Sequence, residues 1–101
     1  MTPREYKPSV CPEVFITHNG KDTGLNVEID LPGVGKKGIE LSVGNEGFCV
    51  CAERDDEMFQ GCYQFAHSVD KNKARARFDN GMLRLDVPFR GMSRSRKIPI
   101  E

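Results

Sequence analysis

The sequence predicts an all-β fold, an antiparallel β-sandwich of about seven to eight strands. Short stretches alternate between apolar and polar residues, which is the period of a strand with one buried face. Glycine, proline, asparagine and aspartate separate these stretches at short, regular intervals, and no window has a helical period. Because each expected strand has one apolar face, two sheets packed face to face bury these faces most economically.

Four strands are expected in the first half of the chain. They cover residues 14–17, 25–31, 39–43 and 48–52. The turn-forming pair Asn19-Gly20 ends the first, and Pro32-Gly33 ends the second, which alternates strictly. The fourth, Phe-Cys-Val-Cys-Ala, is an apolar run short enough to be a buried strand.

The second half continues the pattern with expected strands at residues 61–66, 74–78 and 83–87. Asp79-Asn80-Gly81 predicts a hairpin between the last two, because Asn and Gly accept the positive φ angles of tight hairpin turns. Pro88 ends the final strand.

Composition bounds the class of protein. The 101 residues are enough for one domain. Lys plus Arg and Asp plus Glu are both 15, and this zero net charge argues against nucleic acid or an anionic membrane as a partner. Residues 1–12 have no apolar core of a signal peptide, so the expected location is cytoplasmic.

The four cysteines, Cys11, Cys49, Cys51 and Cys62, are expected as reduced thiols in that compartment. Cys49 and Cys51 would share one face of a strand, and Cys62 would join them if its strand pairs with theirs. The favoured interpretation is plain packing of small apolar side chains in the core. Two alternatives remain: a zinc site, with His67 or Cys11 as a fourth ligand, and a redox disulfide.

No pattern predicts an enzyme or a bound cofactor. Residues 33–38 match G-x-G-x-x-G, but a strand pattern follows them where dinucleotide binding needs a helix, so a loop is expected. The histidines, His18 and His67, lie in no nucleophile motif, and a Cys62–His67 pair is the remaining option. The acidic run at residues 55–57 lacks the alternating ligands of a calcium loop, which favours a solvated turn.

Several segments resemble, in order, the signatures of the small heat-shock protein (Hsp20/α-crystallin) family. Residues 27–34 and 39–43 resemble v-x-v-D-L-P-G-v followed by I-x-V, and residues 52–54 resemble G-E-R. Residues 63–70 follow F-x-L-P-x-x-V-D, with Ala66 where proline is usual. Residues 74–83 and 85–88 resemble A-x-x-x-N-G-v-L and i-x-v-P, and Ile98-Pro99-Ile100 fits the tail motif I-x-I.

The resemblance implies an immunoglobulin-like α-crystallin domain at residues 13–89, a short arm at 1–12 and a C-terminal extension at 90–101. It implies an ATP-independent holdase that binds partly unfolded client proteins and self-associates through its tail. The implied client- and tail-binding groove is lined by Ile39, Leu41, Val43, Ala74, Ala76 and Phe78. Ile98 and Ile100 would insert there, while Pro99 holds them extended.

The chain also departs from the family pattern. Its N-terminal arm is short and mostly polar, and the loop at residues 55–60 is too short to donate a strand to a partner. We therefore expect a monomer, a weak dimer or a small tail-linked oligomer instead of a large cage. A p23-like co-chaperone or adaptor that binds one specific partner is the alternative function.

Overall fold

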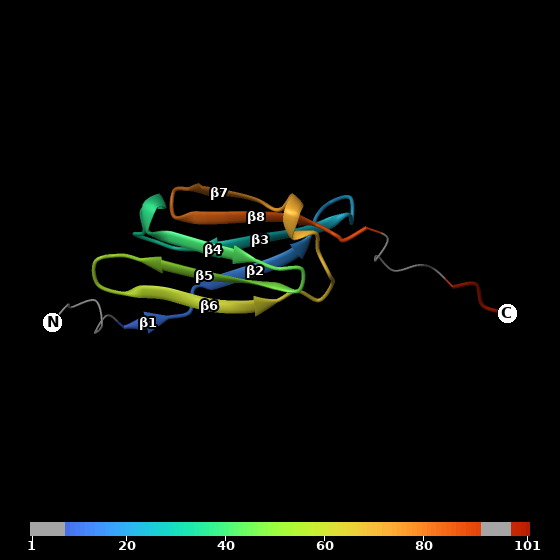
Figure 1. Ribbon diagram of the computed structural model, residues 1–101, viewed down its shortest axis with the longest axis horizontal. Coiled ribbons are helices and arrows are strands. Elements are labelled where there is room, and N and C mark those ends of the chain that lie inside the picture. Colours follow the sequence, from blue (N-terminus) through green and yellow to red (C-terminus); the bar gives the residue numbers. More distant parts are fainter. Residues whose placement is uncertain (1–7, 92–97) are drawn as a thin grey trace.

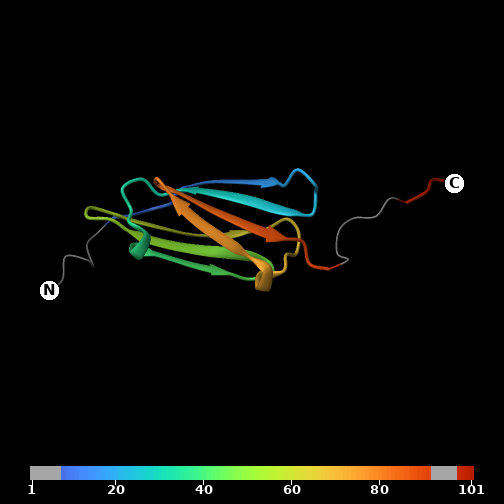
Figure 2. The ribbon, with the colours of Figure 1, turned by 90° about the horizontal axis from the view of Figure 1, so that it is seen from above.

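A computed structural model describes residues 8–91 and 98–101 as a sandwich of two four-stranded sheets (Figure 1). The predicted all-β sandwich is confirmed. Figure 2 shows the two sheets as separate layers, one above the other. Among the described residues the helices are two single 3₁₀ turns, and neither could span a bilayer.

The first sheet has the strand order β1-β6-β5-β4. Its strands are β1 (Ser9–Val10), β6 (Met58–Gln64), β5 (Gly47–Glu53) and β4 (Ile39–Val43). The β5–β6 and β4–β5 pairs are antiparallel, whereas β1 runs parallel to β6 and pairs with it only at Met58 and Phe59. Within residues 8–91, this parallel pair is the one departure from the predicted antiparallel arrangement.

The second sheet has the order β2-β3-β8-β7, and all of its pairs are antiparallel. Its strands are β2 (Glu13–His18), β3 (Gly24–Asp30), β8 (Met82–Pro88) and β7 (Arg75–Asp79). The 3₁₀ turn η2 (Lys36–Gly38) leads into β4, and η3 (Lys71–Lys73) leads into β7. Edge strands β4 and β7 are therefore each preceded by a short basic turn.

The core lies between the sheets and consists of the inward-facing residues, which alternate with outward-facing residues along each strand. Strand β3 contributes Leu25, Val27 and Ile29, and these pair with Val87, Leu85 and Leu83 of β8, all buried. The other sheet contributes Phe48, Val50, Ala52 and Phe59. No buried polar or charged residue occurs in the described part of the chain, so this core is held by apolar packing.

The predicted hairpin between β7 and β8 is present. Asn80 and Gly81 have φ angles of 55° and 82°, the positive values that a two-residue hairpin turn requires. The predicted end of the first strand at Asn19-Gly20 is confirmed, since β2 ends at His18, and the positive φ angle of the β2–β3 turn, 56°, belongs to Asp22. Asn19 instead orders this loop through its side-chain oxygen, which accepts hydrogen bonds from the backbone N–H groups of Lys21 and Thr23.

The G-x-G-x-x-G segment forms the connection from β3 to β4, as predicted. It contains only the three-residue turn η2 and is followed directly by a strand. The long helix whose N-terminus would hold a pyrophosphate is absent from this fully described segment.

Candidate functional site

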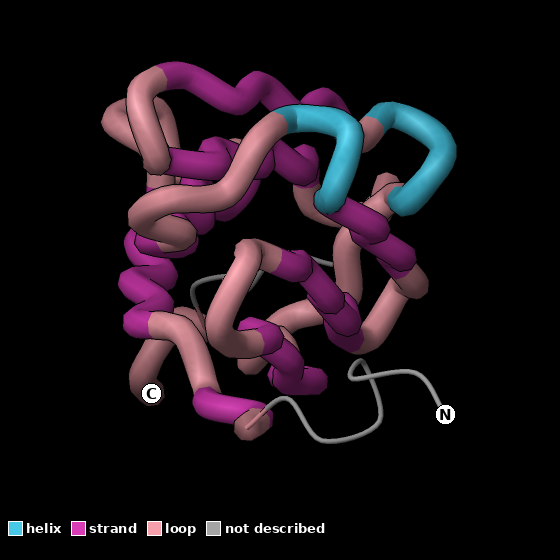
Figure 3. The backbone as a smooth tube through the Cα atoms, turned by 90° about the vertical axis from the view of Figure 1, so that its left-hand side faces the viewer, coloured by secondary structure: helices cyan, strands magenta, loops and turns pink. Residues whose placement is uncertain are grey.

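Strands β4 and β7 are the edge strands of their sheets, and both lie on the same side of the sandwich (Figure 1). Figures 2 and 3 show η2 and η3 on this same side, and Figure 1 shows them at opposite ends of it. We call the strip formed by Ile39, Leu41 and Val43 of β4, together with Ala74, Ala76 and Phe78 beside or on β7, the open edge.

On the β4 wall, Ile39, Leu41 and Val43 face the same way as the core. Each pairs with a buried residue of β5, namely Ala52, Val50 and Phe48 respectively. The three β4 side chains nevertheless stay only partly buried, because no strand lies beyond β4 to cover them. Burying such apolar surface is favourable, so this wall can bind an apolar segment.

On the β7 wall, Ala76 and Phe78 pair with the buried residues Leu85 and Leu83 of β8. Phe78 is partly buried and packs against the core, whereas Ala76 is exposed. Ala74 precedes β7 and is partly buried. The small side chain of Ala76 leaves space that a larger side chain of a bound segment can fill.

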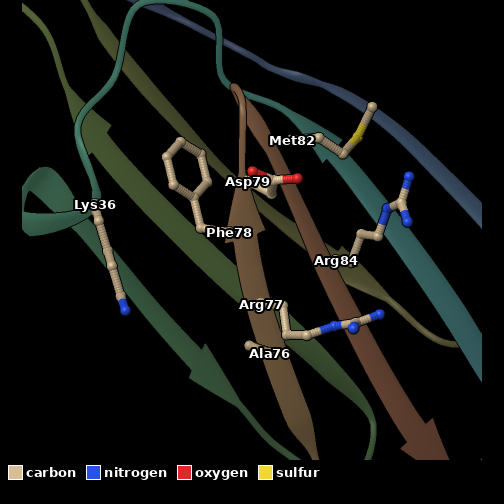
Figure 4. Close-up of a pocket in the computed structure, with 7 residues that line it drawn as sticks. All are labelled: Lys36, Ala76, Arg77, Phe78, Asp79, Met82 and Arg84. Atoms are coloured by element: carbon tan, nitrogen blue, oxygen red, sulfur yellow. The ribbon is translucent and has the colours of Figure 1, made fainter.

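Ala76 and Phe78 also line a cavity of about 500 Å³ at the end of β7 nearest η2 (Figure 4). Phe78 points from β7 toward the segment that carries Lys36, while Arg77 and Arg84 lie on the other side of the strand (Figure 4). Asp79 is the one carboxylate among the lining residues, so the cavity has a net positive charge. None of the three β4 residues belongs to its lining. Whether all six residues of the open edge act as one groove stays a prediction.

The tail motif is accessible. Ile98 is 68% exposed and Ile100 is 97% exposed, and Figure 1 shows this segment clear of both sheets. Residues 92–97 of the expected C-terminal extension lie outside the described residues. The apolar side chains of the motif are thus available for binding elsewhere.

The structure does not support the favoured prediction for the cysteines, namely that they are reduced thiols packed in the core. Cys49 and Cys62 lie directly opposite each other on β5 and β6 and form a disulfide, so the prediction of four reduced thiols is wrong for this pair. Packing in the core is also wrong, since Cys49 and Cys62 are exposed and Cys51 is only partly buried. The reason is the register: Phe48, Val50 and Ala52 occupy the inward positions of β5, which turns both of its cysteines outward.

The two histidines contact each other and Phe89. The rings of His67 and His18 lie 5.3 Å apart, and both contact Phe89, while His18 Nδ1 lies 2.6 Å from Asp22 Oδ1. Over residues 8–91 and 98–101, no three His, Cys, Asp or Glu side chains are arranged to hold a metal ion.

Arg54 organises the acidic turn, a role that the sequence did not indicate. Its guanidinium group lies 3.0 Å from Asp56 and 2.6 Å from Glu57, and it donates a 2.7 Å hydrogen bond to the carbonyl oxygen of Pro32. Arg54 also lies over the ring of Phe59. The β5–β6 turn is thereby joined to the β3–β4 connection, and its carboxylates bind an arginine of the same chain.

Comparison with known proteins agrees with this architecture. The fold is shared with heat shock protein 16.0 from Schizosaccharomyces pombe, with a TM-score of 0.70, 22% identity and coverage of 91% of this chain and 99% of that chain. HSP18.5 from E. histolytica gives a TM-score of 0.73 at 16% identity, covering 90% of this chain and 99% of that one. A mutant of hsp14.1 from Sulfolobus solfatataricus P2 gives 0.73 at 22% identity, covering 96% and 84%.

A sequence relative is small heat shock protein C2 of Rickettsia felis, which is 25% identical in an alignment of length 96 that covers 79% of this chain. The chain spans 62% of the length of that relative. Residues 17–101 match the Hsp20/alpha crystallin family, and this match includes every strand from β3 onward as well as the tail motif. The chain therefore belongs to the Hsp20/alpha crystallin family.

Proposed function

We propose that this protein is an ATP-independent holdase chaperone that binds partly unfolded proteins along the open edge. The observation that carries the proposal is that the inward-facing apolar side chains of β4 and β7 are only partly covered at the side of the sandwich. Partly unfolded proteins expose extended apolar segments, and these match such a strip in shape and chemistry. Members of this family are chaperones and not enzymes, which agrees with a binding role.

The Ile98-Pro99-Ile100 segment is proposed as a competing occupant of the open edge. Its two isoleucines are exposed and alternate across a proline, which keeps the segment extended. Glu101 follows directly, and its negative charge complements the net positive cavity formed by Lys36, Arg77, Arg84 and Asp79. Tail and client would thus exclude one another, and a tail bound to a second copy would link protomers.

We also propose residues 13–89 as the folded α-crystallin domain, preceded by an arm at 1–12 and followed by the extension at 90–101. The proposed setting is the cytoplasm, with client proteins and further copies of this chain as partners. Neither nucleic acid nor a membrane is proposed as a partner, because the net charge is zero.

An aggregation assay with two unrelated clients tests the chaperone role. A heat-denatured dehydrogenase and chemically reduced insulin are mixed with increasing amounts of the protein, without ATP, and light scattering is followed. We expect suppression of both clients near stoichiometric ratios. Failure with every unrelated client would exclude a general holdase and favour the p23-like adaptor, which binds one specific partner.

A further inference from the structure

We propose that Cys49 and Cys62 form a reversible dithiol–disulfide pair that reacts with small-molecule thiols and disulfides of the glutathione type. The pair lies on the outer face of the β5–β6 hairpin, away from the core. The proposal does not depend on the chaperone role of the open edge.

The register of β5 and β6 selects this pair. Cys49 and Cys62 are direct cross-strand neighbours with Cα atoms 4.1 Å apart, which is close to the short spacing of non-hydrogen-bonded antiparallel pairs. Cys51 shares their face but lies opposite Gln60 on one side and Glu40 on the other, so it has no cysteine neighbour across either strand. Of the two outward cysteines of β5, Cys49 is therefore the one that lies opposite Cys62.

Both sulfur-bearing residues are open to solvent. Cys49 and Cys62 are exposed, and they line a shallow surface depression of about 440 Å³ with Ser42, Tyr63 and Gln64. A tripeptide thiol or disulfide can therefore approach the bond without any strand moving. Access to the attacked sulfur is a condition for thiol–disulfide exchange.

The hairpin does not need the bond to stay folded. Strands β5 and β6 pair in register over seven residues, from Gly47↔Gln64 to Glu53↔Met58. The opposite face of the hairpin carries the buried residues Phe48, Val50, Ala52 and Phe59. Because register and core packing already hold the strands, both redox states can share one fold, and exchange can proceed without unfolding.

The reaction is balanced in two exchanges. The thiolate of one cysteine attacks a sulfur of glutathione disulfide, forms a mixed disulfide and releases one glutathione thiolate, which takes up a proton. The second cysteine loses its proton and attacks the protein sulfur of the mixed disulfide, closing the Cys49–Cys62 bond and releasing the second glutathione. The protein dithiol loses two hydrogens, and one glutathione disulfide becomes two glutathione molecules.

The test equilibrates the full chain with glutathione and glutathione disulfide over a wide range of ratios. After acid quenching and alkylation, intact mass and peptide mapping locate the bonds, and circular dichroism monitors the fold. We expect a Cys49–Cys62 linkage that appears and disappears with the ratio, while the β-sheet spectrum stays unchanged. Cys51→Ser and Cys11→Ser should leave this equilibrium in place, whereas Cys49→Ser should stop at a mixed disulfide on Cys62.

Four outcomes would overturn the proposal. A protein that stays a dithiol in excess glutathione disulfide would have no such pair. A bond that excess glutathione cannot reduce in the folded protein, or a fold that is lost on reduction, would make Cys49–Cys62 a fixed structural crosslink. A bond between Cys51 and Cys62, in place of Cys49 and Cys62, would show that the proposed pairing is wrong.

Discussion

Phe78 and Leu83 are cross-strand partners in β7 and β8 and point to the same side of their sheet, yet they differ in burial. Leu83 is 4% exposed, whereas Phe78, on the edge strand, is only partly buried. One step across the sheet therefore separates the core from the open edge. The buried side chain of Leu83 stabilises the core, whereas the partly exposed ring of Phe78 is available for binding.

This difference predicts unequal effects of two truncations. Leu83→Ala should lower the free energy of unfolding by roughly 2–5 kcal/mol, because it leaves a cavity in the core. Phe78→Ala should cost less, about 1–2 kcal/mol, since part of its ring is already in water. Phe78→Ala should still reduce client protection several-fold. Denaturant unfolding and the aggregation assay measure the two effects, and full client protection by Phe78→Ala would remove this residue from the site.

Filling the space beside Ala76 tests the open edge without removing any contact. Ala76 is exposed, so Ala76→Phe should change stability by less than about 0.5 kcal/mol. Its ring would occupy the place of a bound side chain and block client protection. Ala66→Phe is the matched control, because Ala66 is also an exposed alanine but lies outside the open edge. Equal loss of protection in both variants would contradict a specific site.

The backbones of β3 and β8 approach so closely at Gly24 that only glycine should fit there. A Cβ atom there would contact the carbonyl oxygen of Val87 and lie 2.8 Å from the Cα of Pro88, so β3 and β8 would have to separate. Gly24→Ala should lower stability by about 1–3 kcal/mol. Gly20→Ala meets no atom within 4 Å and should be nearly neutral. Similar unfolding midpoints for both variants would show that β3 and β8 can accommodate a methyl group at residue 24.

Tyr63 predicts a loss of stability in alkali. Burial, and secondarily the charge of Cys11, raise the pKa of Tyr63 above its ordinary 10.0. The folded state thus retains the phenol proton better than the unfolded state. The contribution of Tyr63 to the free energy of unfolding is therefore complete below pH 10 and is lost as the pH rises through the folded-state pKa. Tyr63→Phe should flatten this part of the stability–pH curve. An unchanged slope in unfolding experiments would assign the alkaline loss to other groups.

The strand pattern could be read from the sequence because alternation reports directly on which residues face the core. The alternation in residues 25–31 and 83–87 predicts that Val27, Ile29, Leu83 and Leu85 face inward, and all four are buried. Asn80 and Gly81 likewise indicate a hairpin turn by residue type, because both adopt the positive φ angles that the turn needs. The strand Ser9–Val10 could not be found in this way, because two residues contain no period and its pairing with β6 is long-range.

The cysteines show why composition alone misleads. In the run of residues 48–52 every side chain is apolar, so nothing local says which ones face inward. The register with β4 and β6 decides this, and it turns Cys49 and Cys51 outward. The role of Arg54 was missed for a related reason: one of its partners, the carbonyl of Pro32, is 22 residues away in the chain.

The most direct test of the account follows the tail into the open edge. Isotope-labelled chain lacking residues 98–101, which stand clear of both sheets, is titrated with a peptide of residues 92–101, and amide shifts are mapped by NMR. We expect saturable shifts along β4 and β7, centred on Leu41, Ala76 and Phe78, and their loss when Ile98 and Ile100 of the peptide are both serine. Shifts confined to another face, or a serine peptide that binds equally well, would contradict the open edge as the binding site.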